Sequence, residues 1–175
     1  MSCDISRGRL EPCKDSVGGL NAVYFINKGD LGAVTYDSTD TDVIDAVAGT
    51  PDAYKFDIKG ASTYTENITS SRENGTTTFE QVLELQLTKL TKEDNKTVKL
   101  LAFGSHTVLV EDNNGNVFVA GLEHGLDVSG GTIVSGAAMG DMSGYTLTFS
   151  GMEKAPANFL GDTISAVGFS VTEGA

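Results

Sequence analysis

The most constraining feature of the sequence is a long segment, Glu66 to Leu90, that predicts a β-hairpin with only one end in a core. From Phe79 onward apolar and polar side chains alternate, and this period of two places every second residue on the same face of a strand. Before that point, Glu66 to Thr78 contains a single apolar residue, Ile68. We therefore expect an arm whose base packs on the protein and whose far end needs a cover from elsewhere.

The turn of this hairpin is predicted at Arg72-Glu73-Asn74-Gly75, because an Asn-Gly pair tolerates the positive φ angles of a type I′ turn. One face of the return strand is mostly apolar and consists of Phe79, Gln81, Leu83, Leu85 and Leu87. The complete arm is expected at about residues 61–90, and only its base has a core to pack against.

Other segments have the alternation, or the β-branched and aromatic content, of strands. Residues 20–27 and 31–37 are expected to pair as a tight hairpin around Lys28-Gly29-Asp30, whereas 38–52 is interpreted as a connection. Residues 106–111 and 117–120 are expected to form a second hairpin around Asn114-Gly115. The remaining strands are predicted at 53–58, 132–135, 144–150 and 163–171.

One helix is predicted, from Thr91 to Phe103. The Thr91 hydroxyl is placed to accept a hydrogen bond from the backbone N–H near Asp94, and acidic residues in the first turn favour the positive end of the helix dipole. Val98, Leu101 and Ala102 share one helical face, and Gly104 is expected to end the helix in the left-handed conformation.

The pattern of roughly eight or nine strands and one helix, without a β-α-β rhythm, predicts an all-β fold. We expect a mainly antiparallel β-sandwich or barrel with one packed α-helix and the extended β-hairpin arm. Residues 1–19 are polar and end in Gly18-Gly19, so they are predicted to form an extended N-terminal arm. Residues 20–175 are then a single β-sandwich domain, long enough to bury a core without a covalent staple.

The charge balance limits the partners that the chain can have. Twenty-four acidic residues oppose twelve basic ones, a formal net charge of −12, which disfavours wrapping around nucleic acid because phosphates need Lys and Arg partners. An acidic surface keeps a protein soluble, and it also lets DNA pass without sticking. Cys3 and Cys13 lack the spacing of a redox or zinc motif and are interpreted as reduced thiols. No apolar run is long enough to span a bilayer, so synthesis in the cytoplasm and no membrane insertion are expected.

No motif for catalysis is present, and the chain is not expected to be an enzyme. His106 and His124 lack the neighbours of a nucleophile elbow or a zinc protease motif. Glu123 and His124 offer a lone ligand pair, but a solvated loop histidine is the favoured interpretation. No cofactor or metal site is predicted.

Two loops resemble ligand sites only in part. Asp112, Asn114 and Asn116 alternate like the start of a calcium loop, but Gly115 comes one position early for that motif and a hairpin turn is favoured. The Gly-rich run 136–144 leads into a strand rather than a helix, so it does not have the context of a phosphate-binding loop.

Taken together, several features resemble the tail tube proteins, also called major tail proteins, of tailed bacteriophages. These features are the hairpin arm, the β-sandwich with one helix at Thr91 to Phe103 followed by an Asn-Gly hairpin, the free N-terminal arm and the acidic total charge. The closing segment GYTLTFSGMEKAPANFL, residues 144–160, is also similar to the last part of phage tail and head accessory proteins. The resemblance covers most of the chain and is one of architecture and local texture.

This resemblance implies a structural virion protein, made in the host bacterial cytoplasm, whose hexameric rings stack into the tail tube. The hairpin Glu66 to Lys89 would make contacts between subunits, and the arm Ser2 to Gly19 would clamp the adjoining ring. The expected interface residues are Ile68, Arg72, Glu73, Asn74, Gly75 and Phe79 in the hairpin, and Cys3 and Leu10 in the arm. Expected partners are further copies, other phage tail or neck proteins, and double-stranded DNA that passes an acidic lumen without specific binding during ejection. No residue is assigned to the lumen.

Two other functions remain open at this stage. A capsid auxiliary or decoration protein, or a head–tail connector, would use the same sandwich and the same arms. A carbohydrate-binding or adhesin module would instead present exposed aromatic rings, and here aromatic residues make up 7% of the chain, without Trp, and fall mostly at inward strand positions.

Overall fold

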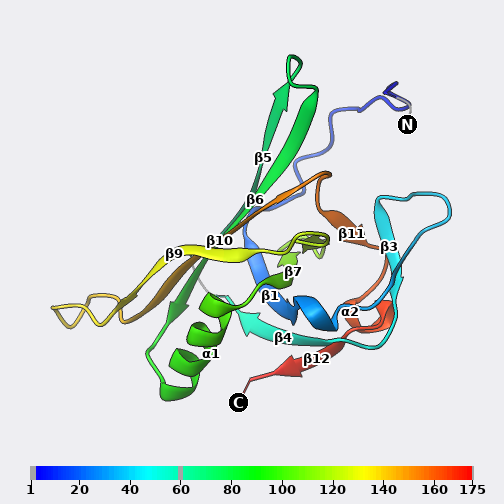
Figure 1. Ribbon diagram of the computed structural model, residues 1–175. Coiled ribbons are helices and arrows are strands. Elements are labelled where there is room, and N and C mark those ends of the chain that lie inside the picture. Colours follow the sequence, from blue (N-terminus) through cyan, green and yellow to red (C-terminus); the bar gives the residue numbers. More distant parts are fainter. Residues whose placement is uncertain (1–2, 59–60, 175) are drawn as a thin grey trace.

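The computed structural model describes residues 3–58 and 61–174, which form two packed β-sheets and one long helix (Figure 1). Met1 and Ser2, with which the predicted arm begins, lie outside the described residues. The larger sheet has the strand order β12-β4-β1-β7-β8-β11-β3-β2 and the smaller one β5-β6-β10-β9. All neighbours are antiparallel except the parallel pairs β11–β3 and β12–β4. The predicted all-β fold, mainly antiparallel with one packed helix, is confirmed.

The elements follow the chain in a simple order. The larger sheet consists of β1 (Leu20–Asn27), β2 (Val34–Tyr36), β3 (Val43–Val47), β4 (Asp52–Asp57), β7 (His106–Asp112), β8 (Val117–Ala120), β11 (Asn158–Leu160) and β12 (Ser170–Glu173). The smaller sheet consists of β5 (Thr63–Ser71), β6 (Thr76–Thr88), β9 (Asp127–Val134) and β10 (Gly144–Glu153). The helical segments are η1 (Lys28–Asp30), α1 (Lys92–Phe103) and α2 (Ile164–Val167).

The first hydrophobic core fills the space between the two sheets. Alternate residues of the central strands supply it, as the period of two requires, and the apolar face predicted for the return strand of the hairpin is among them. Its largest members are Phe25, Leu83, Leu85, Leu126, Tyr145, Leu147 and Phe149. The rings of Phe25 and Phe149 lie with centroids 5.1 Å apart, so the two sheets contact each other directly.

A second core covers the opposite face of the larger sheet. Ala22, Tyr24 and Ile26 of β1 point into it, whereas Val23 and Phe25 point into the first core. The short helix α2 contacts both β3 and β12, strands near or at opposite ends of the larger sheet, so the sheet curls around this core (Figure 1). Burial on both faces explains why β1 is a continuous apolar run rather than an alternating one.

Helix α1 begins as predicted, because the Thr91 side chain accepts a hydrogen bond from the Asp94 N–H at 3.0 Å. Val98 and Leu101 are buried against the first core, but Ala102 is exposed. The prediction for Gly104 is wrong, since its φ of −100° is not left-handed. Its N–H bonds to the Leu100 carbonyl, and the chain then continues extended towards β7. Among the described residues, no helix combines the length and the apolar content that a membrane crossing needs.

The predicted hairpin between residues 20–27 and 31–37 is wrong. Strand β1 pairs with β4 and β7 instead, and the second run contributes only β2, which pairs with β3. The predicted connection 38–52 contains β3. The physical reason is that β1 is apolar on both faces and is satisfied by the centre of a sheet, while η1 turns the chain away and directs the Lys28 side chain to the carbonyls of Gly121 and Leu122.

The C-terminal prediction is also partly wrong. Residues 163–171 form α2 and the start of β12 rather than one strand. The Thr163 hydroxyl accepts from the Ala166 N–H and begins a helical turn, and Gly168, with a φ of 120°, ends it. Strand β11 had no prediction, and β9 is longer than the 132–135 expected for it.

Candidate self-association surface

The β5–β6 hairpin projects from the body of the molecule, and its tip lies far from the other strands in Figure 1. The two strands pair continuously from Thr63 with Glu84 to Ser71 with Thr76, which leaves Arg72 to Gly75 as a four-residue loop. In this loop Gly75 has a positive φ of 65°, but Asn74 does not, so the predicted type I′ turn is wrong. A four-residue loop needs only one left-handed residue, and glycine supplies it without strain.

The base of the hairpin is fixed by buried polar groups as well as by the core. The Gln81 side chain is almost completely buried, and its Oε1 accepts from the Gly121 N–H at 2.8 Å, which joins the two sheets. The Glu66 carboxylate accepts from the Tyr64 hydroxyl at 2.6 Å and from the Ala157 N–H at 3.0 Å. Burial, followed by this hydrogen bond to Glu66, raises the pKa of Tyr64 well above its usual value. The base is therefore rigidly attached.

The tip has no comparable attachment. Ile68, paired in register with Phe79, is 68% exposed, and the loop residues Arg72 to Gly75 are exposed too. Strand β10 stops pairing with β6 at Phe79, so beyond that residue the arm is only two strands wide. Isolated two-stranded ribbons are at best marginally stable in water. Within the described part of the chain, the predicted hairpin residues thus form an uncovered ribbon.

The smaller sheet has two open edges. Strands β5 and β9 are its outermost members, and neither has a strand partner on its outer side among the described residues. Because β5-β6-β10-β9 alternate in direction, β5 and β9 run in opposite directions. Unpaired edge N–H and C=O groups invite another strand. A copy placed edge to edge in the same orientation would join β9 to β5 as an antiparallel pair.

The face of the smaller sheet that points away from the core is polar and acidic. Its four strands contain no Lys or Arg, and their charged residues are Glu66, Glu80, Glu84, Asp127 and Glu153. The outward positions on β6 and β10 carry Glu84, Gln86, Thr146 and Thr148, paired across the sheet. A wide sheet face of this composition has negative potential and offers phosphate no ionic partner.

The N-terminal arm runs over residues 3–19 without helix or strand. The predicted interface residues Cys3 and Leu10 are both exposed, as are Ile5 and Val17. Two asparagines of the β7–β8 turn hold only the root of the arm. Asn114 exchanges hydrogen bonds with both backbone groups of Val17, and Asn113 donates to the Gly18 carbonyl.

The same turn decides between the two interpretations of Asp112. Its Oδ1 accepts from the N–H groups of Asn114 and Asn116 at 2.9 and 2.8 Å. This carboxylate is therefore used to stabilise the turn, and strands β7 and β8 pair on either side of it. The hairpin prediction is confirmed.

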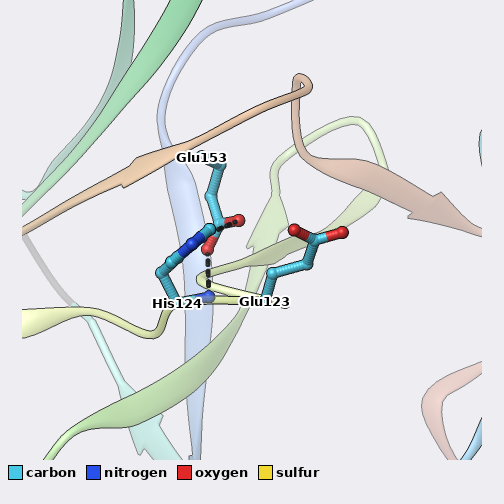
Figure 2. A group of neighbouring side chains, drawn as sticks. All are labelled: Glu123, His124 and Glu153. Atoms are coloured by element: carbon cyan, nitrogen blue, oxygen red, sulfur yellow. Dashed lines mark hydrogen bonds and ion pairs between the residues drawn. The ribbon is translucent and has the colours of Figure 1, made fainter.

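A separate cluster of polar side chains lies where the smaller sheet meets the β8–β9 loop (Figure 2). The buried Glu153 carboxylate accepts from the His124 backbone N–H at 2.8 Å and contacts His124 Nδ1 at 3.2 Å. Glu123 forms an ion pair with Lys154 at 3.2 Å. One ligand atom each of Glu123, His124 and Glu153 lies within 4.8 Å of the others.

Sequence reasoning identified Glu123 and His124 as a lone pair and missed Glu153. A signal was present, because Glu153 continues the inward series of Tyr145, Leu147 and Phe149 on an alternating strand. A carboxylate at an inward position needs a partner, and the nearest histidine in sequence is 29 residues away.

Comparison of the chain with protein-family models, with curated proteins and with solved structures finds no match.

Proposed function

We propose that this protein is a structural subunit that assembles through its β-hairpin arm into stacked rings, forming the tail tube of a bacteriophage virion. The observation that carries the proposal is the four-stranded sheet, which has two open edges and a hairpin that extends beyond its own core. The uncovered edges and Ile68 at the tip become satisfied when identical copies dock side by side. The protein has no catalytic role in this proposal.

Ring closure follows from the strand directions. Copies related by rotation keep the same orientation, so β9 of one copy meets β5 of the next antiparallel and the sheet continues around the ring. Six copies of a four-stranded sheet give a barrel of about 24 strands, more than the roughly 16–18 strands that already enclose a water-filled channel in porins. Closure also removes both edges, the usual remedy for exposed strands.

The acidic face of the smaller sheet then lines the lumen. With Glu80, Glu84 and Asp127 and without a basic residue on these strands, the wall repels phosphate and lets double-stranded DNA slide through. The tip of the hairpin and the N-terminal arm, with Leu10 and Cys3, contact the neighbouring rings. Further partners are other tail or neck proteins of the virion, and the subunit is made in the host bacterial cytoplasm.

Negative-stain electron microscopy of the concentrated, purified protein tests this proposal. Wild-type protein should form rings or striated tubes. A variant in which Ser70–Thr77 is replaced by Asn-Gly should stay folded, by circular dichroism, but elute as a monomer in size-exclusion chromatography. Lys99→Ala, at an exposed position of helix α1, serves as the matched control and should assemble like wild type.

Other outcomes would contradict the tail tube proposal. Discrete trimers or single rings would indicate a decoration or connector protein instead. A wild-type chain that is monomeric at millimolar concentration would refute self-assembly through the arm. A clear hit on a glycan array, together with a monomer, would favour a carbohydrate-binding module.

A further inference from the structure

The cluster of Glu123, His124 and Glu153 lies outside the proposed assembly surfaces and contains the donor types of a metal site. Two carboxylates and one imidazole from two segments of the chain converge on one point, with their ligand atoms within 4.8 Å of each other (Figure 2). We propose that these three side chains bind a divalent transition-metal ion of the zinc type. Imidazole and carboxylate together suit Zn²⁺, and three protein ligands with water in the remaining position are a common arrangement for it.

The loop that carries Glu123 and His124 is held in place more firmly than a surface turn requires. Gly121 accepts from the Lys28 ammonium and from the Thr107 hydroxyl through its carbonyl, and it donates its N–H to Gln81. The Lys28 ammonium also donates to the Leu122 carbonyl. Three side chains from separate elements thus fix one end of the loop, which presents two donor side chains next to β10.

Glu153 provides the second, independent observation. It is only 6% exposed, and both hydrogen bonds to its carboxylate come from His124. A carboxylate has about four lone-pair sites, so this buried group keeps unused acceptor capacity. Glu123 and Glu153 also line a cavity of about 190 Å³ that extends towards Pro156 and Asn158. The cavity gives an ion and its water a path to the buried carboxylate.

Two lysines set the charge of the site. Lys154 is ion-paired to Glu123, and its largely exposed side chain can move into solvent when an ion takes its place. Lys28 stays bound to the loop carbonyls; desolvation lowers its pKa, while the charges of Glu153 and Glu123 oppose that effect. With two carboxylates and two ammonium groups, the site is close to neutral before an ion binds. Removing the Lys154 charge therefore strengthens cation binding.

The experiment is a titration of Zn²⁺ into the full chain by isothermal titration calorimetry at neutral pH. The two exposed thiols of the N-terminal arm are soft zinc ligands, so the parent protein carries Cys3→Ser and Cys13→Ser. One ion should bind per chain, and the thermal midpoint of the parent should rise with Zn²⁺ and return after EDTA. Co²⁺ in place of Zn²⁺ should give a visible absorption band.

Variants in the same background assign the ligands. His124→Gln, at an exposed side chain, and Glu153→Gln should each weaken Zn²⁺ binding by at least about tenfold, since even partners beyond the direct ligands cost 10- to 100-fold. Lys154→Met should strengthen it. Glu173→Gln removes an exposed carboxylate elsewhere and should leave it unchanged. Absence of binding in the parent, or His124→Gln binding as tightly as the parent, would overturn the proposal and leave His124 and Glu153 as an ordinary ion pair.

Discussion

Replacement of Leu83 by Ala tests whether the base of the hairpin belongs to the core of the protein. Leu83 is fully buried, between Tyr64 on β5 and Phe149 on β10, which face it directly in register. Backbone pairing fixes both neighbours, so the cavity left by the substitution collapses little. We therefore expect the free energy of unfolding to fall by about 3–4 kcal/mol, within the range for Leu→Ala in cores. For a domain of this size that lowers Tm by roughly 6–16 °C.

The matched control is Glu84→Ala, one residue further along the same strand. Glu84 is exposed on the opposite face, so its loss should change the free energy of unfolding by no more than about 0.5 kcal/mol. Urea unfolding of both variants in dilute solution, followed by circular dichroism, gives the comparison. A one-residue slip of register would exchange the two faces. Equal effects of the two substitutions, or a larger effect of Glu84→Ala, would refute the assignment.

Two further predictions concern α1 and the residue that follows it. Thr91→Ala removes the N-cap and should lower the free energy of unfolding by about 1 kcal/mol, measured by urea unfolding, whereas Thr91→Ser should restore most of it. His106 is buried, with Nε2 donating to the Leu101 carbonyl and Nδ1 without a partner, and burial lowers its pKa. The unfolded chain therefore binds a proton that the folded chain does not, so this contribution to stability is complete above the ordinary His pKa of about 6.5 and is lost as pH falls below it. The urea midpoint of wild type should fall more steeply between pH 7.5 and 5 than that of His106→Leu; parallel curves would contradict the assignment.

Local patterns in the sequence predict the elements that a single segment specifies. The alternation from Phe79 onward, the Thr91 cap and the Asn114-Gly115 turn each contain their own structural reason, and each lies where the pattern places it. Pairing between distant segments is different. The run at 20–27 is equally compatible with a hairpin neighbour and with the centre of a sheet, and only the two cores above and below β1 decide between them.

The candidate sites differ in the same way. The uncovered hairpin was visible because low apolar content before Phe79 is a property of one segment. The Glu123–His124–Glu153 cluster depends on the pairing of β10 with β6 and on the loop between β8 and β9, and no spacing in the sequence brings Glu153 to His124. Residues such as Lys28 and Gln81, which fix that loop, carry no motif. Their role is set by the carbonyl and N–H groups of Gly121 that tertiary packing brings to them.

The boundary between the fixed and the free part of the hairpin coincides with the proposed metal site. Glu153 is the last residue of β10 to pair with β6, opposite Phe79, and Phe79 in turn faces Ile68 on β5. Beyond this row the sheet narrows from three paired strands to two, so bending of the arm concentrates there. An ion held by Glu153 and the β8–β9 loop would fasten the row to the larger sheet without touching the tip. Shortening the tip should therefore abolish assembly but leave Zn²⁺ binding intact, and His124→Gln should do the reverse.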